Sequence, residues 1–171
     1  MAAADLIAAV KAGDTAAIEA LLASDPELAG AQEKGIPAVR IALYHHQPAA
    51  LEALLAARPP LDWLDHAALG RADDLRRDVA GDPDLLARRS ADGFTALHYA
   101  CFFGGAAATG VLLEAGADPD AEADNGTRVR PLHSAAAAHD AACVQLLLEA
   151  GAHVVIPDYR DADLLVEAIL G

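Results

Sequence analysis

Aromatic side chains are scarce in this sequence: they make up 4% of its 171 residues, whereas 54% of the residues are hydrophobic. Alanine supplies much of the difference, with 44 residues. A core built from such small side chains needs closely spaced helices, which disfavours an aromatic-rich β-sandwich or barrel. Leu, Ile and Val are still too plentiful for a disordered chain. The composition therefore predicts a folded, mostly helical protein of about one domain's length.

Basic side chains are also in short supply. Lys and Arg total 12 against 26 Asp and Glu, which gives a formal net charge of -14. Nucleic acid needs clustered cations to release its counterions, and an anionic membrane surface needs a basic patch. The densest basic pairs, at 76–77 and 88–89, lie among aspartates. We therefore expect neither nucleic acid nor a membrane as a partner.

Cysteine is limited to Cys101 and Cys143, both in alanine-rich apolar stretches, so we expect buried thiols and no disulfide framework. The N-terminal run contains Asp5 and lacks the basic segment of a signal peptide. Residues 93–113 carry no Asp, Glu, Lys or Arg, but their four glycines favour two buried helices joined by a glycine turn. We expect a cytoplasmic protein. Ten Arg against two Lys, together with the alanine content, are typical of a bacterial source.

The chain contains an internal repeat. The segment GFTALHYACFFGGAAATGVLLEAGAD, from Gly93, matches PLHSAAAAHDAACVQLLLEAGAH, from Pro131, at a constant offset of 35 residues. A Leu-His pair and a Leu-Leu-Glu-Ala-Gly-Ala block are common to both copies. A unit of this size cannot bury its own apolar face, so it must stack on its neighbours.

One recurrent turn position extends the repeat along the chain. Glycine and histidine both tolerate the left-handed backbone that ends a helix. A Leu-Leu pair follows the turn by eight and nine residues in every copy except the third, which has Asp78-Val79. The turn is held in order by Gly13, His46, Gly70, Gly104 and His139. The sequence thus predicts one domain, 1–171, of five helix-turn-helix units at about 3–28, 35–58, 61–86, 90–120 and 123–156.

The run GFTALHYA from Gly93 resembles the G-x-T-P-L-H-x-A motif of ankyrin repeats, with Ala96 in place of the usual proline. The run LLEAGAD from Leu112 resembles the L-L-x-x-G-A-D ending of the same repeat. The resemblance implies an all-α ankyrin-repeat solenoid, with short hairpin or loop fingers, terminal capping helices and a concave protein-binding surface. It also implies that His98 and His133 are structural residues hydrogen-bonded at the fingers.

Three departures from a regular array are visible. Residues 58–63 replace a full finger, so that finger should be truncated. His66 occupies a position that other units fill with alanine, and it should displace its helix. A longer last finger carries Arg128 and Arg130, which makes it the one fingertip expected to be cationic. Beyond it, the amphipathic segment 161–170 is expected to form a capping helix over the last repeat.

No residue set predicts catalysis or a cofactor. The sequence lacks a G-x-S-x-G nucleophile turn and a G-x-x-x-x-G-K-[ST] phosphate loop. Cys101 would need a histidine and an orienting group that converge on it. The adjacent His45 and His46 point apart and have no Cys or carboxylate at ligand spacing. We therefore expect no metal and no enzyme. A metal-dependent enzyme or regulator that uses His45 and His46 is the alternative from another functional class.

Candidate partner-binding residues follow from the implied stack, in which the ends of the inner helices and the fingertips face the concave side. Aromatic residues and Arg commonly anchor protein interfaces, and four of the seven aromatics fall at such positions. Phe102 and Phe103 could equally fill gaps between alanine-rich helices. The candidates are Tyr44, His45, Asp92, Phe94, Phe102, Phe103, Asp124, Asn125, Arg128 and Arg130.

The function expected from these features is that of a non-catalytic, monomeric interaction module or scaffold. It would bind another protein through its concave face and fingertips, without any cofactor. The alternative of the same class is a subunit that stabilises one obligate partner. The sequence does not identify the partner.

Overall fold

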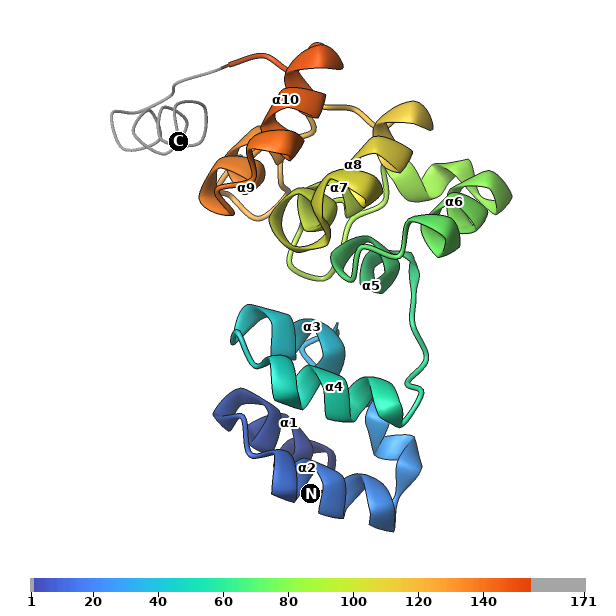
Figure 1. The fold of residues 1–171 in the computed structure, drawn as a ribbon, viewed down its shortest axis with the longest axis vertical. Helices are drawn as coiled ribbons and strands as arrows, with labels where there is room; N and C mark the ends of the chain where they lie inside the picture. The colour runs from blue at the N-terminus through green and yellow to red at the C-terminus, as the bar shows by residue number, and fades with distance from the viewer. Residues whose placement is uncertain (1, 155–171) are drawn as a thin grey trace. The chain divides into compact units, whose positions relative to one another are not determined.

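A computed structural model describes residues 2–154 of the chain (Figure 1). The expected capping helix at 161–170 lies outside the described residues, as do residue 1 and the rest of 155–171. Helices dominate the described part, and they are arranged as five successive antiparallel pairs. The chain divides into two compact units, Met1–Leu61 and Asp62–Gly171.

The first unit contains two helix pairs and a short hairpin. The pairs are α1 (Ala2–Ala12) with α2 (Thr15–Ser24), and α3 (Ala38–Tyr44) with α4 (Pro48–Ala56). Helix α1 packs on α3 and α2 packs on α4, so the pairs stack in register. A 3-10 helix, Pro26–Gly30, leads from α2 towards the hairpin.

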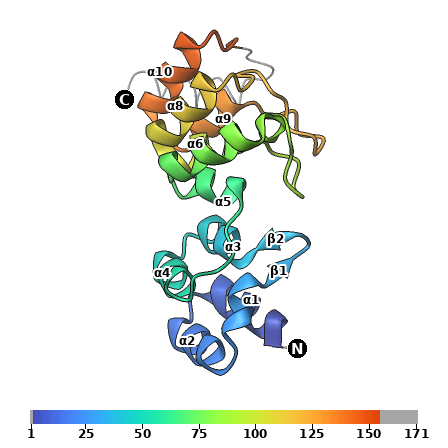
Figure 2. The same cartoon turned by 90° about the vertical axis from the view of Figure 1, so that its right-hand side faces the viewer.

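The hairpin of the first unit is the one finger in the described residues that forms two strands, β1 (Gln32–Glu33) and β2 (Ile36–Pro37) (Figure 2). The strands are antiparallel, with Gln32 opposite Pro37 and Glu33 opposite Ile36. Lys34 and Gly35 between them have φ angles of 52° and 79°. Positive φ at both central residues is what a two-residue hairpin turn of type I′ requires.

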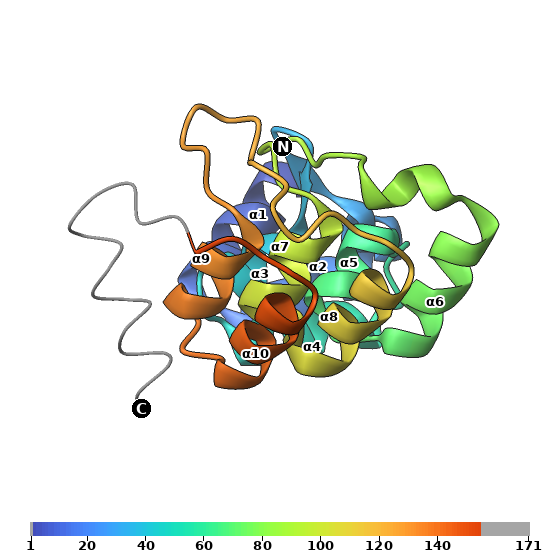
Figure 3. The ribbon, with the colours of Figure 1, turned by 90° about the horizontal axis from the view of Figure 1, so that it is seen from above.

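The second unit contains three helix pairs. They are α5 (Trp63–Ala68) with α6 (Ala72–Gly81), α7 (Ala96–Tyr99) with α8 (Gly105–Glu114), and α9 (Pro131–Ala137) with α10 (Ala141–Glu149). A 3-10 helix, Pro83–Leu86, follows α6, and a π-turn, Ala100–Gly104, extends α7. Helices α5, α7 and α9 form one row, and α6, α8 and α10 form the other (Figure 3).

Leucine and alanine occupy different kinds of position in the core. Large side chains fill the space between helices, and the fully buried ones include Leu6, Ile18, Leu54, Leu75, Leu97, Leu112 and Leu147. Each such burial stabilises the fold by about 1.5–3 kcal/mol. Ala42, Ala100 and Ala135 occupy matching positions on the inner helices and are 0% exposed. The abundance of alanine therefore reflects positions where a larger side chain would push neighbouring helices apart.

Four of the five predicted turn residues adopt the left-handed conformation. Their φ angles are 70° for Gly13, 52° for His46, 68° for Gly70 and 54° for His139. The prediction for Gly104 is wrong: its φ is -88°, and the left-handed residue is Gly105, with φ 76°. The cause is the π-turn, in which the Gly105 N–H donates to the Ala100 carbonyl and lengthens the inner helix by one residue.

Two of the expected departures from a regular array, the short finger at 58–63 and His66, are visible in the structure. Six residues, 57–62, separate α4 from α5, so this connection is as short as the truncated finger requires. His66 turns towards α6, where its Nδ1 lies 2.6 Å from Asp78 Oδ2. In the neighbouring fourth pair the same two positions hold Ala100 and Leu112. His66 and Asp78 therefore form a polar pair where the fourth helix pair has the apolar residues Ala100 and Leu112.

The apolar stretch of the fourth pair is long enough to be mistaken for a membrane span. By length and composition alone, the segment from Ala96 to Glu114 is the one helical stretch within residues 2–154 that meets the requirements. It is divided by the π-turn and by Gly105, and 56% of its most apolar window is buried inside the protein. The expected arrangement of two packed helices with a glycine between them is confirmed.

Candidate functional site

Four aromatic rings form one connected cluster on the fourth helix pair. Phe94, in the finger before α7, lies 6.4 Å from Tyr99 in an edge-to-face arrangement. Tyr99 stacks on Phe103 at 6.4 Å, and Phe103 meets Phe102 edge to face at 4.6 Å. Both geometries are favoured between aromatic side chains. We call these four residues the aromatic ridge. It connects a finger with the end of an inner helix, as expected for a binding surface.

Phe102 and Phe103 differ in how much of each side chain is exposed. Phe102 is 36% exposed, although it is a large apolar side chain. Phe103 is half-buried against Tyr99, which is itself only 2% exposed. Tyr99 was not among the predicted site residues, but it contacts both ends of the ridge. Its position inside the repeat motif is the signal that could have identified it.

Hydrogen bonds fix the two fingers beside the ridge. The Tyr99 hydroxyl donates to both carboxylate oxygens of Asp92, at 2.8 and 3.0 Å. The Asn125 side chain donates from Nδ2 to the Asp92 carbonyl at 2.9 Å, and the Asp124 N–H donates to the Gly93 carbonyl at 2.9 Å. The structure therefore brings Asp92, Phe94, Asp124 and Asn125 together, as the sequence predicts.

His98 joins the inner helix to both fingers. Its Nδ1 accepts hydrogen bonds from the N–H of Thr95 at 3.2 Å and from the Thr95 hydroxyl at 2.8 Å. Its Nε2 then donates to the Val129 carbonyl at 2.9 Å. Burial lowers the pKa of His98 to about 4, although the bond to Val129 acts in the opposite direction. The imidazole is therefore neutral at pH 7, and every polar atom of the ring is hydrogen-bonded.

The expected cationic fingertip is corrected by the structure. Glu122 accepts from Arg128 Nε at 2.8 Å and from Arg130 Nη2 at 2.9 Å, and these arginines lower the pKa of Glu122 to about 2. Arg130 also lies 3.5 Å from Asp120. The loop closes through a bond from the Ala123 N–H to the Val129 carbonyl. Acidic residues six to ten positions earlier are thereby folded back onto the arginines, which the sequence spacing alone does not reveal.

Tyr44 and His45 lie in the first unit, at the end of α3. Tyr44 is 37% exposed, and His45 is the residue that ends the helix and is also exposed. His46 follows in the left-handed turn, with a φ angle of 52°, whereas His45 has a φ angle of -92°. The two adjacent histidines therefore differ in backbone conformation. Within residues 2–154, no group of three or more His, Cys, Asp or Glu side chains is placed to hold a metal ion.

The two cysteines meet inside the second unit as free, buried thiols, as expected. The Thr109 hydroxyl lies 3.3 Å from Cys143 Sγ and 3.7 Å from Cys101 Sγ. Cys143 Sγ also donates to Asp140 at 3.1 Å. The hydrogen bond with Cys143, together with burial, raises the pKa of Cys101. The same hydrogen bond lowers the pKa of Cys143. A protonated, buried thiol is a poor nucleophile, so Cys101 contributes to packing.

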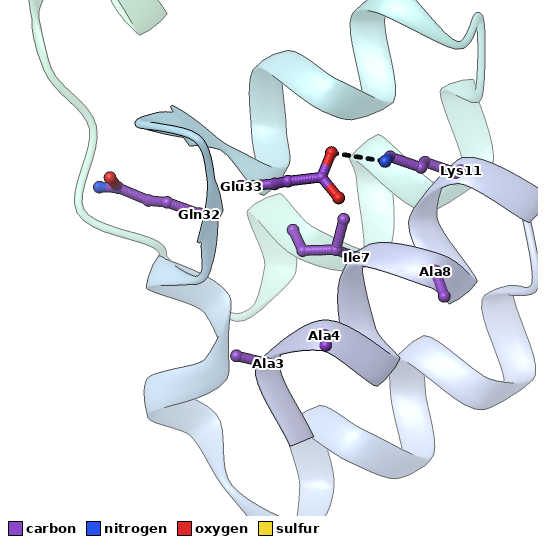
Figure 4. A pocket seen from close by; sticks show the side chains of 7 residues that line it. All are labelled: Ala3, Ala4, Ile7, Ala8, Lys11, Gln32 and Glu33. Atoms are coloured by element: carbon purple, nitrogen blue, oxygen red, sulfur yellow. Dashed lines mark hydrogen bonds and ion pairs between the residues drawn. The ribbon is translucent and has the colours of Figure 1, made fainter. Parts of the chain in front are cut away.

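A hollow of about 450 Å³ lies between α1 and the hairpin of the first unit (Figure 4). It is lined by Ala3, Ala4, Ile7, Ala8, Lys11, Gln32 and Glu33. Lys11 Nζ lies 2.5 Å from Glu33 Oε2 at its edge, and this hydrogen bond lowers the pKa of Glu33. The lining holds one ion pair, one amide and small apolar groups. Glu33 is the single carboxylate of this lining.

Comparison with known families supports the repeat assignment. The model for ankyrin repeats (three copies) matches residues 6–158 of the chain. The comparison with curated proteins finds no match.

Proposed function

Since this chain belongs to the ankyrin-repeat family, whose repeats are generally protein–protein interaction modules, we propose that it is a non-catalytic scaffold. In this proposal a partner protein binds the aromatic ridge of the second unit together with the adjoining fingertips. Asp92, Asp124 and Asn125 supply polar contacts at the edge of that surface. Arg128 and Arg130 contribute through their shared pairing with Glu122, which holds the finger in shape.

The observation that carries the proposal is the exposure of Phe102. In a protein with few aromatics, three ridge residues are buried or half-buried, and the fourth places 36% of its side chain at the surface. Exposed aromatic residues next to a rigid support are typical anchors of protein interfaces. The ring stacking below Phe102 and the hydrogen bonds of Asp92 preform the surface, so binding orders few side chains.

The test is affinity capture from cells of the source organism, with the wild-type chain, Phe102→Ala and Leu148→Ala as baits. Leu148 is a matched control because it is 38% exposed but lies on α10, in the row formed by α6, α8 and α10. We expect the wild type and Leu148→Ala to retain the same partner, and Phe102→Ala to lose it while remaining folded, as its circular dichroism spectrum would show. Equal recovery by all three baits contradicts the proposal.

The same capture separates a scaffold from a dedicated subunit. A scaffold recovers several proteins, each in less than equimolar amount. A subunit that stabilises one obligate partner recovers a single protein in equimolar amount, and removing that partner from the cell lowers the level of this chain.

A further inference from the structure

We propose that Asn125 is a site of spontaneous chemical modification, at which the backbone nitrogen of Gly126 displaces the side-chain amide and leaves aspartate or isoaspartate at position 125. The reaction requires no enzyme and no reactant besides water. Three features of the fingertip before α9 support it: the residue pair itself, the turn that Asn125 forms, and the contact that the reaction breaks. This reactivity is independent of the proposed function.

The residue pair is the most reactive one for this chemistry. Asn125 is the single asparagine among the 171 residues, and a glycine follows it directly. Asparagine is a chemically labile residue, and a following glycine has no side chain to hinder its nitrogen or to restrict its backbone. Asn125 and Gly126 are both exposed, so water reaches them. A β-carbon on Gly126 would meet no atom within 4 Å, so the backbone has room to move during the attack.

The turn at the fingertip brings the two reacting groups together. The Thr127 N–H donates to Asn125 Oδ1 at 3.1 Å, which closes an Asx turn. The ring closed by this hydrogen bond contains both the side-chain carbon Cγ of Asn125 and the nitrogen of Gly126. The Asn125 side chain is therefore folded back over the peptide group whose nitrogen attacks it.

Two hydrogen-bond donors face the oxygen on which negative charge develops. Besides the backbone N–H, the Thr127 hydroxyl donates to Asn125 Oδ1 at 2.6 Å. Attack on Cγ converts the carbonyl group into a tetrahedral intermediate with its charge on this oxygen, and donors already placed there stabilise that charge. The Thr127 hydroxyl also accepts from the Val129 N–H at 3.4 Å, which helps to orient it.

The reaction balances with water as its co-reactant. The Gly126 nitrogen loses its proton and forms a bond to Asn125 Cγ. The bond from Cγ to Nδ2 breaks, and Nδ2 takes up a proton and leaves as ammonia. Water then adds to either carbonyl carbon of the resulting cyclic imide, which gives aspartate or isoaspartate. Nothing is oxidised or reduced.

The atom that leaves is one that ties two fingers together. Asn125 Nδ2 donates to the Asp92 carbonyl, in the finger before α7, at 2.9 Å. A carboxylate in its place only accepts hydrogen bonds, so it cannot replace this donor. In the isoaspartate product the backbone also gains a carbon atom next to Asp124, whose N–H donates to the Gly93 carbonyl. Modification of Asn125 should therefore loosen the pairing of the two fingers.

The test follows the mass of the intact chain during incubation at neutral and at mildly alkaline pH. We expect the wild type to gain the mass difference between OH and NH2, faster at the higher pH, and to release an equal amount of ammonia. Fragment ions of the tryptic peptide 90–128 should place the change at position 125. Asn125→Gln is the control, because a longer side chain closes the imide ring much more slowly. A constant mass of the wild type, or an equal gain in Asn125→Gln, overturns the proposal.

Variants of the next two residues test the role of the turn. Gly126→Ala crowds the attacking nitrogen and disfavours the φ angle of 81°, so it should slow the conversion about 5- to 20-fold. Thr127→Val removes the hydroxyl donor but keeps the backbone N–H, and it should slow the conversion about 2- to 5-fold. Thr127→Ser keeps the hydroxyl and should react like the wild type. If Thr127→Val reacts as fast as the wild type or faster, the role assigned to the turn is wrong.

Hydrogen exchange measures the effect on the fingers. Asn125→Asp is identical to one of the two products, and the converted wild type contains both. In each of them the Asp124 amide should exchange about 3- to 10-fold faster than in the unconverted protein. The amides of α8 serve as the control and should exchange at unchanged rates. Equal exchange of the Asp124 amide before and after conversion would show that Asn125 does not hold the two fingers together.

Discussion

Gly104 and Ala67 approach so closely that a β-carbon on Gly104 would lie 1.9 Å from the Ala67 carbonyl oxygen. A β-carbon on Gly70 would likewise lie 2.7 Å from the Gly104 carbonyl oxygen. The third and fourth helix pairs therefore meet backbone against backbone at their turns. Any side chain at either position would separate them.

This contact predicts that Gly104→Ala destabilises the fold, although Gly104 does not need glycine for its own φ angle. The added methyl group has to displace backbone, so we expect a loss of about 1–3 kcal/mol in the free energy of unfolding, measured in urea. Gly110→Ala in α8 is the control, because nothing lies within 4 Å of its β-carbon position. It should stabilise the protein by about 0.5–1 kcal/mol. Losses of equal size in both variants would contradict this explanation.

Burial of His98 predicts a pH-dependent stability. Its pKa is about 4 in the folded protein against about 6.5 in an unfolded chain. The unfolded state therefore binds more protons between these values, and stability falls as the pH drops from 6.5 towards 4. Between pH 7 and pH 5 we expect a loss of about 2 kcal/mol from this residue.

The measurement is the free energy of unfolding in urea at several pH values for the wild type and His98→Gln. The variant should be less stable at pH 7 and should lose most of the slope between pH 7 and 5. Glu122 acts in a lower range: its folded pKa of about 2 lies below the ordinary value, so its contribution is lost only as the pH falls below about 4.5. An unchanged slope in His98→Gln would assign the pH dependence to other groups.

The pair His66 and Asp78 predicts strong coupling between two substitutions. Each single change, His66→Ala or Asp78→Leu, leaves one polar group without its 2.6 Å partner and should cost about 1–3 kcal/mol. The double variant recreates the Ala and Leu found in the next pair, and it should recover most of that loss. Unfolding of all four proteins gives the coupling energy. Additive losses would show that the two side chains are energetically independent.

Leu112 and Leu148 test the assignment of the core. Leu112 is 0% exposed and Leu148 is 38% exposed, although both belong to the recurring Leu-Leu pairs. Leu112→Ala should lower the free energy of unfolding by about 2–5 kcal/mol. Leu148→Ala should lower it by less than about 1 kcal/mol. Similar losses in the two variants would mean that α10 buries the face that is exposed here.

Helix pairs were predictable because the signals that specify them are local. The Leu-Leu pairs, the buried alanines and the turn residues recur at fixed spacing, and four of those turns adopt the expected backbone. The π-turn at Gly104 has no such recurring signal, and the residue that Gly104 approaches, Ala67, lies 37 residues earlier in the sequence.

The candidate site was predictable in its position but not in its electrostatics. The motif register placed Phe94 and Phe102 on one surface, and the ring contacts agree with that. The charge of the last finger depends on how Glu122 folds back onto Arg128 and Arg130. Loop closure of this kind leaves no periodic trace in the sequence.

Through the hydrogen bond from His98 to Val129, the last finger is held by two repeats. The loop that carries Asp124 and Asn125 precedes α9, yet the inner helix of the previous pair holds it in place. If α9 and α10 unfold locally, that loop is released and the hydrogen bonds at its fingertip are lost. Occupation of the ridge should then slow amide hydrogen exchange in α9 and α10, so a ligand that touches neither helix would still report on the folding of the end of the array.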